Sequence, residues 1–239
     1  MTSYRVALQR SDGSVLPDAP LTALLHTPVA SLAPWRESQN YPGQRHLTGL
    51  AYLARTGTHV PFESRLEQSA LLRLDHDPTT VRVAAQPFLL TWKEAGEEEK
   101  VVGHVPDFLV ERHRQSPLVI DVKPKAFVDR PHNVSAFTAT RQACDRLGWT
   151  YAVWTEPSRT FLLNLRWLSA YHRLPFEHDV YAPTLLTLLQ GRPCTISELV
   201  GALEPACLVR PVLFHLLWRR QILANLEMLL DDHTTVQLA

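Results

Sequence analysis

Two apolar runs, joined by a short polar segment, constrain this chain more than any other feature. The first run is His104-Val105-Pro106-Asp107-Phe108-Leu109-Val110 and the second is Leu118-Val119-Ile120-Asp121-Val122-Lys123-Pro124. Side chains two apart in a strand point to the same face, so Asp121 and Lys123 are expected to lie side by side. A hairpin between the runs would bring Asp107 within reach of both. The pattern predicts two neighbouring strands that each carry a carboxylate.

Two carboxylates at this distance repel each other, and a bound divalent cation is the usual remedy. Hard oxygen ligands suit magnesium or manganese, which can polarise a phosphate and acidify a water. Lys123 would orient that water or neutralise charge that develops on phosphorus. An Asp-X-Lys alone is more often a solvated surface pair, but Asp107 at hairpin distance favours catalysis. The pattern therefore indicates metal-dependent phosphodiester chemistry.

A third carboxylate is predicted upstream, in the stretch 61–74. Its apolar residues follow helical spacing, and Glu63 and Glu67, four apart, share a face of that helix. Most glutamates on such helices are simply solvated. Two predicted strands follow, Thr80–Ala85 and Pro87–Trp92, and this order could place the helix beside the sheet that carries the two aspartates.

With these residues together, the chain resembles the TnsA-like endonuclease subunits of heteromeric cut-and-paste transposases. These enzymes are a branch of the restriction-endonuclease-like PD-(D/E)XK nucleases. The resemblance covers about residues 47–175 and rests on elements that recur in order: Ser64-Arg65-Leu66-Glu67, Asp77-Pro78, Gln86-Pro87, Pro106-Asp107-Phe108-Leu109-Val110 and Asp121-Val122-Lys123-Pro124.

The resemblance implies a role for each site residue. Glu67 matches the helical carboxylate of the family, with Glu63 as the alternative if the helix is shifted by one turn. Asp107 matches the central aspartate, Asp121 the acid-or-amide position and Lys123 the lysine. Glu67, Asp107 and Asp121 would hold Mg²⁺, with Mn²⁺ as an alternative. Since TnsA-type enzymes can carry glutamine where this chain has Asp121, the aspartate strengthens the interpretation as a metal ligand.

The resemblance also implies an activity and partners. Such a subunit cuts the 5′ strands of double-stranded DNA at transposon ends. It works with a DDE-type transposase and an AAA+ ATPase, and the C-terminal part joins those contacts. Two alternatives stay open, namely a stand-alone restriction or repair nuclease of the same fold, and a non-catalytic DNA or protein adaptor.

The elements after the second apolar run predict the fold class. A helix around Ser135–Leu147 ends at Gly148, and another apolar strand follows at Thr150–Trp154. A strand, a helix and a strand imply a parallel pair with a right-handed connection. We expect an α/β, restriction-endonuclease-like mixed sheet flanked by helices.

Three regions are expected along the chain. Prolines at five positions break up residues 1–57, which are predicted to form a partly irregular N-terminal arm. Residues 58–176 would be the nuclease core, against which a helix around 164–171 would pack. In residues 177–239, three short helices and a terminal hairpin predict a winged-helix-like domain. Thr195 and Glu198 form a capping-box pattern at the start of its second helix.

Charge is unevenly distributed, although the formal net charge is zero. From 122 to 150 five basic residues face only two acidic ones, and we expect Lys125, Arg130 and Arg141 of this stretch to contact DNA. From 178 to the end, four basic residues face six acidic ones, so protein docking by this region is at least as well supported as DNA binding.

Other patterns exclude some classes of protein. The chain has no apolar run of membrane-spanning length and no signal-peptide pattern at its start, which favours a cytoplasmic protein without a membrane partner. Its three cysteines are widely spaced and indicate neither a disulfide framework nor a zinc site. His104 could lie near the active site, but a surface or supporting role is favoured.

Overall fold

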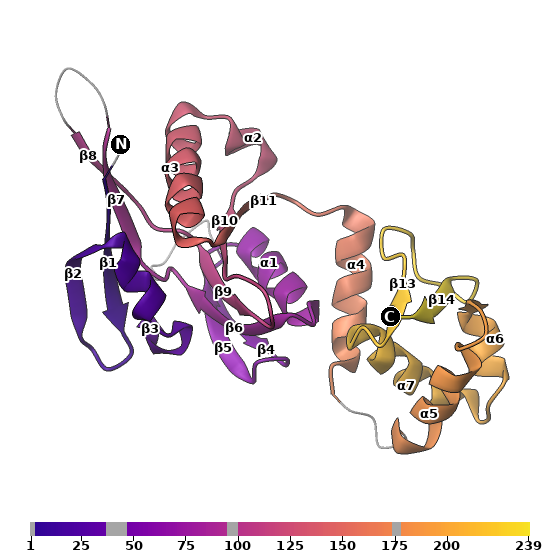
Figure 1. Cartoon of the computed structure of the whole chain (residues 1–239). Helices are drawn as coiled ribbons and strands as arrows, with labels where there is room; N and C mark the ends of the chain where they lie inside the picture. Colours follow the sequence, from indigo (N-terminus) through magenta and orange to yellow (C-terminus); the bar gives the residue numbers. More distant parts are fainter. Residues whose placement is uncertain (1–2, 37–46, 95–99, 174–177) are drawn as a thin grey trace. The chain divides into compact units, whose positions relative to one another are not determined.

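The structure, a computed structural model, describes residues 3–36, 47–94, 100–173 and 178–239 (Figure 1). The chain divides into two compact units, the first formed by Met1–Leu71 and Thr79–Glu156, the second by Leu72–Pro78 and Pro157–Ala239. Among the described residues, no helix is long and apolar enough to cross a membrane.

The first unit contains two large sheets and one separate hairpin. A five-stranded sheet has the order β2-β1-β7-β8, with β3 paired to β1, and a four-stranded sheet has the order β11-β10-β9-β6. The hairpin pairs β4 with β5. The strands of this unit are β1 (Tyr4–Arg10), β2 (Val15–Pro20), β3 (Leu32–Ala33), β4 (Gly49–Leu53), β5 (Thr58–Phe62), β6 (Thr80–Ala85), β7 (Leu89–Glu94), β8 (Lys100–His104), β9 (Phe108–Arg112), β10 (Leu118–Val122) and β11 (Thr150–Trp154).

The N-terminal region is more regular than the sequence suggested. Strand β1 buries Val6 and Leu8 in the core of the first unit and pairs with β7, while two 3-10 helices, η1 (Leu21–His26) and η2 (Val29–Ser31), follow β2. Residues 4–33 are therefore more regular than expected for the predicted, partly irregular arm. The prolines misled that prediction because β2, which carries two of them, lies at the edge of the sheet, where an N–H is not needed for pairing.

The four-stranded sheet confirms the mixed α/β prediction. Strand β10 pairs antiparallel with β9 and parallel with β11. The crossover between β10 and β11 contains α2 (Lys125–Val128) and α3 (Pro131–Leu147), and α3 ends at Gly148, which has φ 68°. Helix α3 begins earlier than predicted because proline fits the first turn of a helix. Its Ala143 and Cys144 are buried in one core with Val119 and Tyr151.

The two predicted strands after the first helix join different sheets. Helix α1 (Arg65–His76) supplies residues to both units, and β6 then pairs with β9. Strand β7, by contrast, pairs with β1 and β8 in the other sheet. Only the first of these two strands therefore extends the sheet that carries the aspartates.

The second unit is mainly helical. It contains α4 (Arg159–Leu168), the 3-10 helix η3 (Ser169–Tyr171), α5 (His178–Leu188), α6 (Ile196–Gly201), α7 (Ala206–Trp218), β12 (Cys194–Thr195), β13 (Ile222–Ala224) and β14 (Thr235–Leu238). Leu165 and Leu168 of α4 are fully buried in the core of this unit. The helix predicted to pack against the nuclease core thus belongs to the hydrophobic core of the second unit. The boundary predicted between 176 and 177 lies outside the described residues.

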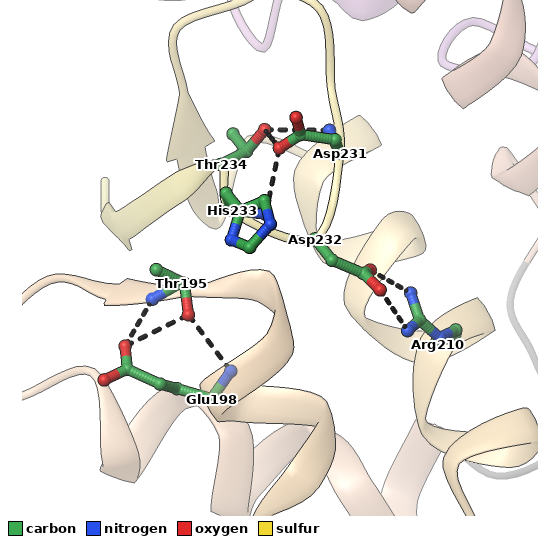
Figure 2. A network of polar contacts seen from close by, with 7 residues as sticks. All are labelled: Thr195, Glu198, Arg210, Asp231, Asp232, His233 and Thr234. Carbon is green, nitrogen blue, oxygen red and sulfur yellow. Dashed lines mark hydrogen bonds and ion pairs between the residues drawn. The ribbon is translucent and has the colours of Figure 1, made fainter.

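The predicted three helices and terminal hairpin are present in this unit, as α5, α6, α7 and β13-β14, and the small sheet has the order β12-β14-β13. The predicted capping box at α6 is confirmed, since the Glu198 N–H donates to Thr195 Oγ1 (3.1 Å) and the Thr195 N–H to Glu198 Oε2 (2.7 Å) (Figure 2). Arg210 on α7 binds both carboxylate oxygens of Asp232, which fixes the β13–β14 connection. The winged-helix assignment itself stays a prediction.

Candidate active site

Asp107 and Asp121 lie across from each other on neighbouring antiparallel strands. Strand β9 begins directly after Asp107, and the last paired residues of β9 and β10 are Phe108 and Ile120. Continued by one residue beyond the paired strands, this register would place Asp107 opposite Asp121. The hairpin thus brings together the two carboxylates that the sequence pointed to, as expected from the pairing of residues on one sheet face.

Asp107 is partly exposed and held by the backbone of the next strand. Its Oδ2 accepts a 2.6 Å hydrogen bond from the Val122 N–H, and its own carbonyl oxygen accepts one of 2.8 Å from the Gln86 N–H. Removal from water, followed by the charges of Asp121 and Glu67, raises the pKa of Asp107 to about 8. Without a cation, this carboxyl group is therefore largely protonated near neutral pH.

Asp121 is buried and bonded on both oxygens. His104 Nε2 lies 2.8 Å from Oδ1, and the Tyr151 hydroxyl donates a 2.5 Å hydrogen bond to Oδ2. Burial, and then the charge of Asp121, raises the pKa of the Tyr151 hydroxyl, which keeps it a donor. These two partners satisfy a carboxylate that water does not reach.

Glu67 contributes to the site by charge and also caps its own helix. Its Oε1 accepts a hydrogen bond from the Ser64 hydroxyl (2.7 Å) and its Oε2 one from the Glu63 N–H (2.8 Å), while Ser64 Oγ accepts from the Glu67 N–H. Burial raises the pKa of Glu67, and these hydrogen bonds oppose the rise. Glu63, the alternative, forms an ion pair with Arg36 at 3.0 Å. The Ser-X-X-Glu spacing is thus a helix-capping signal as well as part of the family motif.

Lys123 follows directly after β10, with Asp121 two residues before it. Its backbone N–H donates to the Trp154 carbonyl (2.9 Å), which holds this end of β10 beside β11. The charge of Lys123 lowers the pKa of Asp107, against the larger effect of burial. The predicted set of residues thus interacts electrostatically around Asp107.

Comparison with known proteins adds a family to this geometry. Residues 77–156 match the sequence model of the family described as "TnsA-like endonuclease N terminal". This region is a TnsA-like endonuclease N-terminal domain. The match supports a nuclease of the transposase family, and no curated protein matches the chain.

The TnsA-like domain includes three of the four predicted site residues, Asp107, Asp121 and Lys123. Glu67 lies upstream of the matched region. The connection between Glu67 and the site therefore rests on the structure, in which its charge acts on Asp107.

The carboxylate oxygens of the TnsA-like domain are suitable ligands for a hard divalent cation. No described residue donates a hydrogen bond to Asp107 Oδ1. Burial, and then the like charges of Asp121 and Glu67, raise the pKa of this carboxyl group, and a cation would relieve the repulsion between these charges. Among the described residues, no group of three or more His, Cys, Asp and Glu side chains is arranged to hold a metal. Asp107 and Asp121 are thus suitable ligands, and a complete set with Glu67 stays a prediction.

The residues predicted to bind DNA lie on the exposed surface of the crossover. Lys125 begins α2, where its backbone N–H donates to Glu156 (2.9 Å). The Arg130 guanidinium lies 4.1 Å from the centre of the Phe127 ring, and that of Arg141 lies 5.1 Å from the centre of the Tyr151 ring. Arg141 therefore packs against a residue that bonds Asp121, a contact that the charge pattern did not reveal.

Sequence reasoning overlooked Tyr151 and favoured a surface or supporting role for His104. Tyr151 lies in a strand that the sequence marks only as apolar. A buried tyrosine needs a partner for its hydroxyl, which is a usable signal, but the partner is set by the β10–β11 register. His104 comes from the other sheet, so no spacing in the sequence predicts that it reaches Asp121.

Gln86 is a second unusual neighbour of Asp107. It is buried, it has φ 46°, and no described residue pairs with its Oε1. Backbone strain of this kind persists where the surrounding structure holds it. Here the Gln86 N–H holds the Asp107 carbonyl oxygen at the start of β9.

Proposed function

We propose that this chain is the Mg²⁺-dependent DNA endonuclease subunit of a heteromeric cut-and-paste transposase, acting in the cytoplasm and cutting the 5′ strands at transposon ends. The observation that carries the proposal is the meeting of Asp107 and Asp121 within a TnsA-like endonuclease domain, where burial, and then the charges of Asp121 and Glu67, raise the pKa of Asp107 to about 8. A site that concentrates negative charge in this way is suited to a divalent cation.

Each site residue has a distinct task in this proposal. Asp107 and Asp121, with Glu67 from α1, would hold the cation, and Mn²⁺ is an alternative to Mg²⁺. A divalent cation bound there supplies positive charge that polarises the scissile phosphate and acidifies a water. Lys123 would orient the attacking water or neutralise charge that develops on phosphorus.

The DNA itself would approach along the basic crossover. Lys125 and Arg130 are exposed on α2 and the turn before α3, on the same chain segment that follows Lys123. Positive charge beside a nuclease site guides a phosphate backbone toward it. These contacts would be independent of base sequence, so selection of the transposon end would come from a partner.

The second unit would supply contacts with that partner. Its residues from 178 onward carry more acidic than basic groups, which disfavours duplex DNA as its main ligand. We propose that it docks onto the DDE-type transposase and the AAA+ ATPase through a winged-helix-like module. The transposase would then present the flanking phosphate to the nuclease site.

The test is cleavage of a transposon-end duplex by the full chain in Mg²⁺ or in a chelator. The assay is run with and without the DDE-type transposase and the AAA+ ATPase that are its proposed partners. We expect 5′-strand nicks that need Mg²⁺, need the partners and disappear in Asp107→Ala. Tight sequence-specific binding and cutting by the isolated chain would instead favour a stand-alone nuclease. Mn²⁺ and Mg²⁺ binding at background level would favour a non-catalytic adaptor.

A further inference from the structure

Asp121 is held from two directions by residues of different strands. His104 lies at the end of β8 in the five-stranded sheet, and Tyr151 lies on β11 in the four-stranded sheet. Their polar atoms lie 2.8 Å and 2.5 Å from the two carboxylate oxygens. The Asp121 side chain is 2% exposed, whereas that of His104 is 20% exposed, so the histidine is the more accessible of the two.

Helix α3 supports both partners from outside. Phe137 meets the His104 ring edge-on at 6.4 Å between centroids, and the Arg141 guanidinium covers the Tyr151 ring at 5.1 Å. Aromatic and cation–π contacts of this kind restrict ring orientation. The two donors are therefore themselves fixed, and they determine in turn how the Asp121 carboxylate is rotated.

The two hydrogen bonds leave Asp121 able to accept more. An ionised carboxylate has about four acceptor positions, so each oxygen that accepts one hydrogen bond keeps another lone pair. With an ionised Asp121, His104 must carry its hydrogen on Nε2. Partners of this type commonly orient metal-binding side chains.

We infer that His104 and Tyr151 are positioning residues of the nuclease site, which hold the Asp121 carboxylate in the orientation that binds the divalent cation. This inference rests on the proposed function, since it assumes that Asp121 is a ligand. The alternative hypothesis is that the two residues only satisfy the hydrogen-bonding needs of a buried carboxylate. The two hypotheses predict different cation affinities for variants of His104 and Tyr151 whose stability is unchanged.

The experiment measures Mn²⁺ binding to the full chain by calorimetry, without DNA, together with thermal unfolding and the Mg²⁺ dependence of DNA nicking. The variants are Tyr151→Phe, His104→Ala and His104→Gln, whose amide N–H can replace the imidazole donor. The controls are Tyr52→Phe and His113→Ala, which change exposed residues. Asp107→Asn shows that the measured binding belongs to this site.

We expect Tyr151→Phe and His104→Ala to weaken Mn²⁺ binding by about 10- to 100-fold and to raise the half-saturating Mg²⁺ concentration similarly. His104→Gln should recover most of the affinity, and both controls should match wild type. If His104→Ala does not fold, the contrast between Tyr151→Phe and His104→Gln still decides the matter.

Suppose that the wild-type chain binds Mn²⁺ and that Asp107→Asn abolishes this binding. Unchanged Mn²⁺ affinity in well-folded Tyr151→Phe and His104→Ala would then overturn the positioning role and leave the proposed function intact. A loss of Mn²⁺ affinity that parallels the decrease in melting temperature, with no recovery in His104→Gln, would also overturn the positioning role. His104 and Tyr151 would then have only a structural role. A wild-type chain that binds no Mn²⁺ would refute the proposed function and this inference with it.

Discussion

The Asp107 carboxylate accepts a 2.6 Å hydrogen bond from the backbone N–H of Val122, the residue between Asp121 and Lys123. The bond ties the start of β9 to the end of β10, and so fixes Asp107 beside the Asp-X-Lys segment. A hydrogen bond to a carboxylate lowers its pKa, yet the pKa of Asp107 is raised to about 8, because burial and neighbouring negative charge outweigh that bond.

Asp107→Ala should abolish DNA cleavage and leave the fold intact. The substitution removes one hydrogen bond, worth about 1 kcal/mol, but it also removes a polar carboxyl group that is costly to bury, so the free energy of unfolding should change little. Nicking assays in Mg²⁺, with Asp145→Ala on the exposed surface of α3 as control, measure the effect. Undiminished nicking by a folded Asp107→Ala protein would contradict the assignment.

Glu67→Gln should impair cleavage far more than Glu63→Gln does. The amide keeps one acceptor for the cap of α1, so the stability cost should stay within about 1 to 2 kcal/mol. What the amide loses is the negative charge that acts on Asp107. Comparing cleavage rates with chemical denaturation separates the two effects, and a larger rate loss in Glu63→Gln would show that the other turn of the helix carries the functional carboxylate.

The stability of the cation-free protein should fall as the pH rises through about 8. Asp107 has an ordinary pKa near 3.8 when unfolded and one of about 8 when folded, so between these values the folded state binds the extra proton. Its stabilising contribution is fully present below the unfolded value and is lost as the pH passes the folded value. The unfolding free energy of wild type minus that of Asp107→Asn should therefore decrease between about pH 5 and pH 9.

Mg²⁺ should reverse this trend, because the cation competes with the proton on Asp107. Denaturation in chelator and in saturating Mg²⁺ across the same pH range provides the comparison. A wild-type curve parallel to that of Asp107→Asn at every pH would rule out a raised Asp107 pKa.

Binding of the isolated chain to duplex DNA should be weak and strongly salt-dependent. Lys125→Ala and Arg130→Ala should each reduce the slope of log affinity against log salt by about 1, with the same effect on unrelated sequences. Arg10→Ala in β1, outside the basic segment, is the matched control. Gel-shift titrations at several salt concentrations give the slopes, and identical slopes for all proteins would remove the crossover from the DNA interface.

A chain that ends at Glu156 should be more soluble than one that ends at Arg173. The longer truncation keeps α4 but exposes Leu165 and Leu168, which are buried in the core of the second unit, so it should aggregate. The shorter one keeps Asp107, Asp121 and Lys123 and should lose partner binding in a pull-down. Equal solubility of the two truncations, or partner binding by the shorter one, would contradict the unit boundary or the docking role.

The sequence alone determined the local arrangement of the site. Alternating faces along Leu118–Val122 and the hairpin before it place Asp107, Asp121 and Lys123 together, because strand periodicity and pairing are local rules. The capping box at Thr195 and the αL stop at Gly148 were readable for the same reason.

Only the tertiary structure decided which distant residues meet these elements. The approach of His104 from the second sheet, the Tyr151 bond to Asp121 and the burial of α4 in the second unit depend on contacts between segments far apart in the chain. Such contacts are selected by burial of apolar surface over the whole fold, which has no direction or fixed sequence spacing. The sequence therefore indicates the candidate residues of the site, and the packing of the sheets decides how each carboxylate is held.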